Sequence, residues 1–381
     1  MLSLLSAWQF LFAFEVALFS SYTVLMHLYS KKYVSDPLKA EVFSKGGHLP
    51  TITLIIPMYN EEKVIEEKIE NTSHLDYPED KLEVILLNDH STDLSQSVSE
   101  MKIKGISLKN ARVVMNQGGK GKARALNWIF PSLKSEITII SDADAFLKSD
   151  SLLWVVNHYK DSHIGGVTGK IVILSDKARL SKSQEDSYRF YFDIWRQGES
   201  QIQSVSVCNG PLMSFRTDLL HNITIDPDAY ADDSDLLFKI IGLGYRVVYE
   251  PSAIVYERVP LSTKGRIIQK MKRINGLRKV YINNLNLLGK GMFGKIVFPY
   301  ALMVHIVSPI IVLSLTILYP LVVFNNPGYL GFLILFFIPK LENTLLSFII
   351  TQLIMNFSFL VKTAGSWEAI EDARYNLKQK N

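Results

Sequence analysis

Two aspartates one residue apart, Asp142 and Asp144, are the side chains in this sequence best suited to hold a metal ion. They follow Ile137–Ile140, a run of β-branched residues that predicts a buried strand. In open α/β sheets, ligands bind beyond the carboxyl ends of the strands. Two carboxylates at that place favour Mg²⁺ or Mn²⁺, with diphosphate oxygens completing the coordination shell. The alternative is a solvated turn or a helix cap, because Asp-x-Asp pairs are common.

A second acidic cluster opens a predicted helix. Asp232, Asp233 and Asp235 come before and among apolar residues at helical spacing, which continue to Gly242. Helix capping and the helix dipole both favour carboxylates in a first turn. Those structural roles account for one or two of the three aspartates, so the cluster also offers a carboxylate for chemistry.

A third candidate is the segment Gly119–Lys122, in which glycine and lysine alternate. No Ser or Thr follows Lys122, so the GxxxxGK[ST] phosphate loop is not matched, and neither is GxGxxG. A flexible turn with two lysines ahead of a helix would still cradle an anion. The alternative is a basic surface turn.

The elements that must position these side chains alternate between strands and helices, which predicts an α/β fold with a mostly parallel sheet and right-handed crossovers. Polar residues gather after each predicted strand, so they should converge on one edge of the sheet. The predicted strands are Thr51–Pro57, Glu83–Leu87, Arg112–Met115, Ile137–Ile140, Ile164–Leu174, Tyr245–Tyr249 and Ala253–Tyr256, with helices at Glu61–Ile69 and Gln184–Gln201.

The N-terminal segment Leu4–Tyr29 is almost wholly apolar, with Glu15 as its single charge. At about 1.5 Å per residue it is long enough to cross a bilayer. A cleaved signal peptide is the alternative, but the segment has no basic front and is too long. Because Lys31 and Lys32 follow directly, we expect a membrane anchor whose C-terminal end faces the cytoplasm.

The C-terminal third is basic and then apolar. Leu261–Gly289 pairs an apolar face with lysines and arginines, which favours a helix on an anionic membrane surface over one packed on the domain. Ile296–Phe324 predicts a second span, and Asn325–Gly328 an outer turn. Tyr329–Val361 is broken by Pro339–Asn343, so we expect one bent or partly re-entrant crossing, with four spans in total as the alternative.

Composition excludes some classes of protein. Of the 381 residues, 48% are hydrophobic, which is high for a purely soluble protein. The single cysteine rules out an internal disulfide, and no Cys/His spacing typical of zinc sites occurs. A net charge of +4 gives no argument for nucleic acid as a partner.

Taken together, these motifs resemble family 2 glycosyltransferases with the GT-A fold, in particular the membrane-bound synthases of cellulose, hyaluronan and poly-N-acetylglucosamine. The resemblance runs from about Thr51 to Gly276 and has apolar spans on both sides, as in that branch. It depends on five blocks that occur in the family's order: Ile56–Glu61, Asn88–Asp93, Gly121–Asn127, Asp142–Asp144 and Asp232–Asp233.

The resemblance implies which residues bind the donor. Pro57, Tyr59 and Glu61 belong to the opening nucleotide-binding block, Asp89 would hydrogen-bond the nucleotide base, and Lys122 would meet the donor. Asn88 departs from the family's DDxSxD pattern, in which the first position is an aspartate.

The resemblance also implies the catalytic and metal-binding groups. Asp144, with Asp142 beside it, would bind Mg²⁺ or Mn²⁺ and the donor diphosphate. Asp233 would be the base that takes a proton from the acceptor hydroxyl. Neighbouring Asp232 and Asp235 would raise its pKa by like-charge repulsion.

One block departs from the family. The synthases carry QxxRW near the interfacial helix; here Gln269 matches the glutamine, whereas Lys272 and Arg273 stand in place of Arg and Trp. These three residues would still contact the donor phosphates, although lysine offers a point charge where arginine offers a fork. The missing indole weakens the interpretation as a processive enzyme.

We therefore expect a membrane-bound, metal-dependent, inverting glycosyltransferase that moves a hexosyl or N-acetylhexosaminyl group. Its donor would be a nucleotide diphosphate sugar, first of all a UDP-sugar, and its acceptor a lipid-linked or saccharide molecule. Membrane lipids, but no nucleic acid, would be further partners. The alternatives are a processive polysaccharide synthase and a catalytically inactive scaffold that binds nucleotide sugars.

The expected organisation has five parts, with the catalytic domain on the cytoplasmic side of the cell membrane. They are a transmembrane helix over 1–30, a GT-A domain over 31–260, an amphipathic interfacial helix over 261–290, a transmembrane region over 291–362 and a cytosolic tail over 363–381.

Overall fold

The computed structural model describes residues 3–32, 49–106, 108–174, 179–228, 231–258, 263–338 and 341–360. These residues form two compact units. One contains an eight-stranded sheet with its helices and comes from residues 49–106, 108–174, 203–228, 231–258 and 263–269. The other is helical and comes from residues 3–32, 179–202, 270–338 and 341–360.

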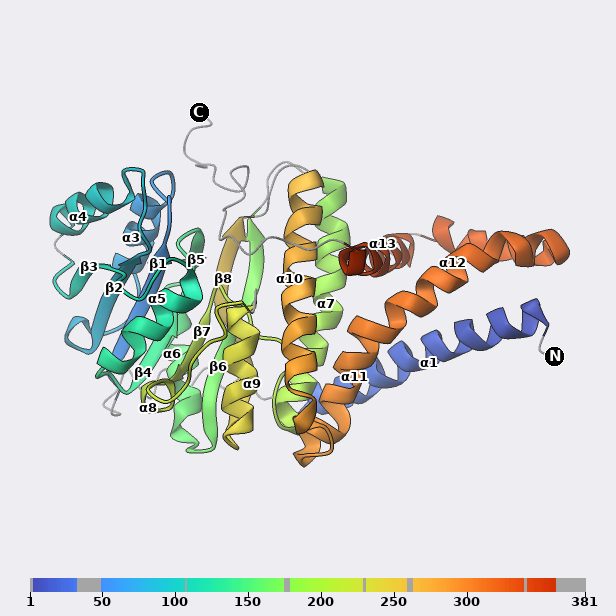
Figure 1. The fold of residues 1–381 in the computed structure, drawn as a ribbon, viewed down its shortest axis with the longest axis horizontal. Helices are drawn as coiled ribbons and strands as arrows, with labels where there is room; N and C mark the ends of the chain where they lie inside the picture. Colours follow the sequence, from blue (N-terminus) through green and yellow to red (C-terminus); the bar gives the residue numbers. More distant parts are fainter. Residues whose placement is uncertain are drawn as a thin grey trace. The chain divides into compact units, whose positions relative to one another are not determined.

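The sheet has the strand order β3-β2-β1-β4-β7-β6-β8-β5 (Figure 1). Strands β3, β2, β1 and β4 are parallel to one another. Strand β7 is antiparallel to β4 and β6, whereas β6 and β8 are parallel and β5 lies antiparallel at the edge. The strands are β1 Ile52–Met58, β2 Leu82–Asn88, β3 Ala111–Met115, β4 Ile137–Ile140, β5 Ala145–Leu147, β6 Ile164–Leu174, β7 Met213–Arg216 and β8 Arg246–Arg258.

The predicted α/β class and mostly parallel sheet are confirmed, and the differences lie in the details. Strand β1 continues through Pro57 to Met58, where we expected it to stop at the proline. The two strands predicted at the end of the domain are one long strand, β8. Its register with β6 shifts between Gly169 and Lys170, so an irregularity bridges the break that the sequence suggested.

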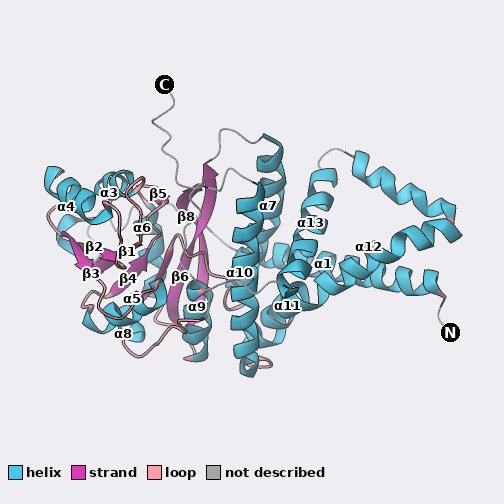
Figure 2. Cartoon of the chain, turned by 45° about the horizontal axis from the view of Figure 1, so that its top comes forward, coloured by secondary structure: helices cyan, strands magenta, loops and turns pink. Residues whose placement is uncertain are grey.

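Helices surround this sheet (Figure 2, strands in magenta). Every residue of β1 and β4 is buried, which explains their continuous apolar sequences. The helices are α3 Ile65–Ser73, α4 Ser95–Gly105, α5 Lys122–Ile129, α6 Ser151–Asn157, α8 Thr217–Leu220 and α9 Asp232–Gly242, with short 3₁₀ turns at Glu79–Lys81, Phe130–Ser132 and His158–Lys160.

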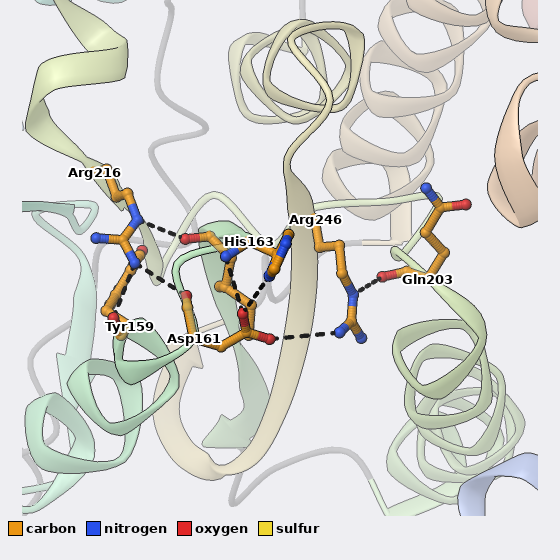
Figure 3. A network of polar contacts seen from close by, with 7 residues as sticks. Tyr159, Asp161, His163, Gln203, Arg216 and Arg246 are labelled. Atoms are coloured by element: carbon orange, nitrogen blue, oxygen red, sulfur yellow. Dashed lines mark hydrogen bonds and ion pairs between the residues drawn. The ribbon is translucent and has the colours of Figure 1, made fainter.

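At the edge where β6 and β8 begin, a polar network fastens the sheet (Figure 3). The guanidinium of Arg216 donates to the backbone carbonyls of Ile164, Tyr159 and Asp161 at 2.8–3.0 Å. Arg246 Nε donates to the Gln203 carbonyl at 2.9 Å. These contacts join the end of β7 and the start of β8 to neighbouring loops.

The helical unit combines apolar helices of different lengths with the polar helix α7. Its elements are α1 Leu4–Ser30, α7 Arg179–Ile202, α11 Phe298–Leu302, α12 Ser308–Asn325 and α13 Leu341–Leu360, with π-helical turns at Phe293–Val297 and Met303–Val307 and 3₁₀ segments at Leu285–Leu287 and Pro327–Phe337. The rings of Tyr22 and Tyr300 stack with centroids 3.4 Å apart, and Trp195 meets both edge-on. The Tyr22 hydroxyl donates to buried Glu199 at 2.8 Å.

Helix α10, Thr263–Asn283, occupies the predicted amphipathic segment. Its apolar residues divide: Ile274 and Leu277 are buried, whereas Ile267 and Ile268 are exposed. Arg278 is one of the arginines that the sequence places on the charged face of the segment Leu261–Gly289, but it is buried. Its guanidinium donates to the His305 carbonyl at 2.8 Å and to Ser358 Oγ at 2.7 Å, and these partners account for its position inside the unit.

Two stretches of the described residues are long and apolar enough to cross a bilayer, Leu4–Ser30 and Phe293–Asn325. Only 17% and 22% of their apolar windows are buried within the chain, whereas the core helix of a soluble protein would be mostly buried. Thr344–Leu360 is apolar but shorter. The break that we predicted after Ile338 includes residues 339–340, which lie outside the described residues.

Candidate active site

Three carboxylates from two distant segments surround one lysine of the sheet unit. Lys122 Nζ donates to Asp142 Oδ1 at 2.8 Å and lies 3.2 Å from Asp232 Oδ2. Asp233 adds to the electrostatic field at the same ammonium. Burial alone would lower the pKa of Lys122, but these carboxylates together raise it well above its usual value. The lysine is therefore a permanent cation in a negatively charged site.

The local folding of each segment explains this meeting. Lys122 is the first residue of α5, directly after Gly121. Asp142 follows β4 by two residues, and Asp232 and Asp233 are the first residues of α9. Gly119 and Gly121 have φ of 94° and 121°, values that side chains with a Cβ rarely adopt. The glycines thus serve the turn that delivers Lys122.

Gly210 brings the predicted base close to the Asp-x-Asp turn. Its N–H donates to Asp233 Oδ2 at 3.1 Å. A Cβ added at Gly210 would lie 3.3 Å from this oxygen and 3.8 Å from Asp142 Oδ2. Two carboxylate oxygens from separate elements therefore border the same small space, which only a residue without a side chain leaves open.

A backbone hydrogen bond and the side chain of Lys68 stabilise the turn that carries Asp142 and Asp144. Its backbone closes with a hydrogen bond from the Ala145 N–H to the Asp142 carbonyl at 3.2 Å. Lys68 of α3 donates to Ser141 Oγ at 2.7 Å and to the Ala145 carbonyl at 2.5 Å. Burial lowers the pKa of Lys68 to about 7, while Asp142 and Asp144 act in the opposite direction.

The loops after β1 and β2 are joined to each other and to the glycine turn. Asn60, with φ of 54°, accepts a hydrogen bond from Thr92 N at 2.8 Å. Lys120 Nζ lies 2.9 Å from the Tyr59 hydroxyl and 4.5 Å from the centre of its ring. Tyr59 therefore stands beside the glycine turn, where the prediction puts the nucleotide.

Asp89 braces the glycine turn. Its Oδ1 accepts from Asn116 Nδ2 at 2.7 Å and its Oδ2 from Gly121 N at 2.7 Å, and the residue is only 1% exposed. The predicted hydrogen bond to a nucleotide base stays a prediction. These contacts position Gly121 and, through it, Lys122.

The other predicted donor-binding residues differ in their exposure. Pro57 is buried within β1 beside Leu87 of β2. Glu61 is 6% exposed, and its N–H donates to Ser95 Oγ at 2.7 Å. On α10, Gln269 and Lys272 are half-buried and Arg273 is exposed. Donor contacts for these residues stay predictions.

Asp235 is the member of the acidic cluster with a structural role. Its Oδ2 accepts from Asp226 N at 2.9 Å and from Lys239 Nζ at 2.5 Å. It ties the preceding loop to α9, as expected for an acidic residue in a first helical turn. Asp233 Oδ1 accepts from Ser234 N at 2.6 Å. The predicted rise in the pKa of Asp233 stays a prediction.

The donor set fits a divalent cation that shares its shell with a substrate. Among the described residues, no group of three or more His, Cys, Asp or Glu side chains is arranged to hold a metal by itself. Mg²⁺ commonly binds through one or two carboxylates plus substrate phosphates. Asp142 and Asp144 supply that number. Apart from its 3.2 Å ion pair with Lys122, the buried Oδ2 atom of Asp232 makes no hydrogen bond within the described residues, so it could accept a further contact.

Sequence reasoning missed Lys68, Asn71 and Gly210 as parts of this site. A signal for Lys68 did exist, because it shares the buried face of α3 with Ile65, Ile69 and Thr72 at helical spacing. Asn71 and Gly210 carry no such signal, since their roles depend on which loop lies opposite.

Comparison with known proteins indicates the family to which the sheet unit is similar. Residues 53–223 match the family model described as Glycosyl transferase family 2. A probable glycosyltransferase YdaM of Bacillus subtilis (strain 168) is 27% identical over 241 residues. The poly-beta-1,6-N-acetyl-D-glucosamine synthase of Staphylococcus aureus (strain COL) is 26% identical over 238 residues. Each alignment covers 62% of this chain and 57% of the relative, so the match spans little more than half of those proteins.

A solved structure supports the fold. The mannosyltransferase PcManGT from Pyrobaculum calidifontis, in complex with GDP-Man and Mn²⁺, superposes with a TM-score of 0.70. It is 24% identical, and the superposition covers 91% of this chain and 99% of that one. Residues 53–223 therefore match glycosyl transferase family 2, and the sheet unit has the GT-A fold.

Proposed function

We propose that the protein is a membrane-bound, inverting glycosyltransferase that uses a nucleotide diphosphate sugar. The observation that carries this proposal is the meeting of Asp142, Asp232 and Asp233 around Lys122 and Gly210. The site would combine acidic groups for a divalent cation with a separate carboxylate for proton transfer, and these are the two requirements of the reaction.

The chain's own residues would divide the work as follows. Asp142 and Asp144 would hold Mg²⁺ or Mn²⁺, which supplies positive charge to the leaving diphosphate when bound. Lys122 would orient Asp142 and offer its ammonium to the donor. Tyr59 and the braced glycine turn would border the nucleotide.

Asp233 would be the general base. It would take the proton of an acceptor hydroxyl while that oxygen attacks the anomeric carbon from the face opposite the leaving group. The glycosidic bond forms as the bond to the diphosphate breaks, so the configuration inverts, as in an inverting hydrolase in which a carboxylate activates water. The hydrogen bond from Gly210 fixes the carboxylate that performs this step.

The donor and acceptor follow from chemistry and from the relatives. The name of the S. aureus relative indicates an N-acetylglucosamine polymer, which favours a UDP-linked hexosamine among the donors to be tested first. The two apolar stretches and the basic helix α10 favour an acceptor at the membrane, either lipid-linked or a saccharide, with catalysis on the cytoplasmic side. A processive polysaccharide synthase is the second candidate, and product length on a gel separates the two.

The test is a donor panel with membranes that contain the protein. UDP-, GDP- and other nucleotide sugars are offered with Mn²⁺, Mg²⁺ or EDTA, and release of the nucleotide is measured. We expect metal-dependent release from one donor class, and its loss in membranes with Asp144→Asn. If no donor gives release above that control, the proposal is wrong and the inactive scaffold becomes the better account.

A further inference from the structure

Helix α3 presents a charged group to the interior of the sheet unit. Lys68 has no solvent exposure, and its neighbours on the buried face are Ile65, Ile69 and Thr72. A buried ammonium is unfavourable unless partners replace its water. The contacts of Lys68 must therefore compensate for the lost hydration of its ammonium.

The contacts of Lys68 bracket the two aspartates. Ser141, which precedes Asp142, accepts a hydrogen bond from Nζ at 2.7 Å, and Ala145, which follows Asp144, accepts one at its carbonyl at 2.5 Å. One ammonium thus fixes both ends of the turn. Asp142 and Asp144 also interact electrostatically with it, so the protonated form of Lys68 offsets part of their charge.

The same contacts reach the predicted base. Ser141 Oγ donates to the carbonyl of Pro211 at 2.8 Å. Gly210, one residue earlier, donates to Asp233 at 3.1 Å. Lys68 is therefore connected through Ser141 to the loop that holds Asp233.

Asn71, one turn further along α3, holds the far end of the segment. Its side-chain amide donates to the Leu147 carbonyl and its Oδ1 accepts from the Leu147 N–H, both at 2.8 Å. Strand β5 is the edge strand of the sheet. The amide therefore pairs with one residue of this edge as a neighbouring strand would, and it fastens β5 to the helix.

We infer that Lys68 and Asn71 are positioning residues, which hold the Ser141–Leu147 segment so that Asp142 and Asp144 are presented to the donor in a fixed geometry. The inference depends on the proposed function for what these aspartates bind. Residues that orient metal ligands typically change metal affinity 10- to 100-fold when they are replaced. Lys68 and Asn71 thus extend the site to helix α3, because both side chains bind the segment that carries the aspartates.

Two variants and one matched control test this role. Lys68→Met keeps the length of the side chain and removes the ammonium, and Asn71→Ala removes the amide. Lys63→Met makes the first change at an exposed lysine just before the same helix. Hydrogen–deuterium exchange of the peptide over 141–147 measures whether the turn is held. Calorimetry of UDP and GDP with increasing Mn²⁺ measures whether the aspartates are presented correctly.

We expect faster exchange over 141–147 in both variants and not in Lys63→Met. We also expect the Mn²⁺ concentration for half-maximal nucleotide binding to rise about tenfold or more. A purely structural role would lower the melting temperature and the bound fraction but leave this Mn²⁺ concentration unchanged.

Unchanged exchange and unchanged Mn²⁺ dependence in a folded variant would overturn the inference. If Lys68→Met does not fold, Asn71→Ala carries both measurements. If the wild-type protein binds neither nucleotide with Mn²⁺, the proposed function fails; the exchange experiment still decides whether Lys68 and Asn71 hold the turn.

Discussion

Two opposite edges of the sheet, where its parallel strands begin and where they end, both carry dense polar networks. The cations in these two networks donate to different kinds of groups. At the edge where β6 and β8 begin, Arg216 and Arg246 donate to backbone carbonyls (Figure 3). At the opposite edge, Lys122 meets the side chains of Asp142 and Asp232. A cation that donates to backbone carbonyls has a structural role, because buried carbonyls must be hydrogen-bonded in the folded protein.

The two edges differ in the charge that their networks leave uncompensated, and this difference indicates which edge is functional. Several carboxylates around one ammonium leave negative charge that a divalent cation or a proton would neutralise. A guanidinium that donates to uncharged carbonyls leaves no negative charge for a cation or a proton to neutralise. We therefore expect substitutions at the Lys122 edge to change activity more than stability, and substitutions at the Arg216 edge to do the reverse.

The largest expected effect is that of Asp233→Asn. The amide keeps the shape, and its single oxygen can accept from the N–H of either Gly210 or Ser234 but not from both. It cannot take a proton from an acceptor. Transfer should fall by roughly 100- to 10,000-fold, with donor binding within about threefold of the wild type. Radiolabelled sugar transfer and calorimetry measure the two quantities.

Asp161→Asn is the matched control at the other edge, where the carboxylate interacts with His163 and Arg246. It should leave transfer within about twofold of the wild type. Substantial transfer by Asp233→Asn would show that another group is the base.

The reverse case is Arg216→Met. The substitution removes the side-chain donor from three backbone carbonyls, of which that of Asp161 still accepts from the Ile164 N–H at 3.1 Å. Each buried polar group that is left unpaired is unfavourable by about 1–3 kcal/mol. With partial rehydration, the free energy of unfolding should fall by roughly 2–4 kcal/mol, with transfer per folded molecule unchanged. Thermal melts in detergent and active-site-normalised assays test this. An unchanged melt with lost transfer would erase the distinction between the edges.

Much of this arrangement was predictable because it depends on local pattern. Continuous apolar runs identified β1, β2 and β4, and the family's order of motifs pointed to Asp142 and Asp233. Strands β5 and β7 were missed because each has only three or four residues. Lys68 was missed because a charged residue suggests solvent until its partners are known. Arg278 was assigned to the wrong face for the same reason.

A smaller effect is expected from Gly210→Ala. Its methyl group would lie 3.3 Å from Asp233 Oδ2, which is tight enough to displace the carboxylate by a few tenths of an ångström. We expect transfer to fall about tenfold, because small displacements of catalytic groups are costly, with little change in melting temperature. Gly242→Ala is the control, since no atom lies within 4 Å of its added Cβ. Equal transfer in the two variants would mean that Asp233 tolerates the shift.

A dependence of stability on pH also separates Lys68 from Arg216. The pKa of Lys68 is about 7 in the folded protein and about 10.4 for an unperturbed lysine. Below pH 7 both states bind the proton, and the wild type has the full disadvantage of a buried charge. Between these values only the unfolded state keeps the proton, so the free energy of unfolding should rise with pH, by at most about 1.4 kcal/mol per unit. Arginine stays charged throughout this range, so the Arg216 edge should contribute no such slope.

Melting curves of the metal-free protein in EDTA, taken from pH 6.5 to 9.5, measure this slope. The stability of the wild type relative to Lys68→Met should increase with pH, whereas the difference between the wild type and Lys63→Met should stay flat. Parallel curves for all three proteins would mean that Lys68 keeps its proton when folded. The Asp142–Asp144 turn would then rest on a permanent cation, and in that respect the two edges of the sheet would be alike.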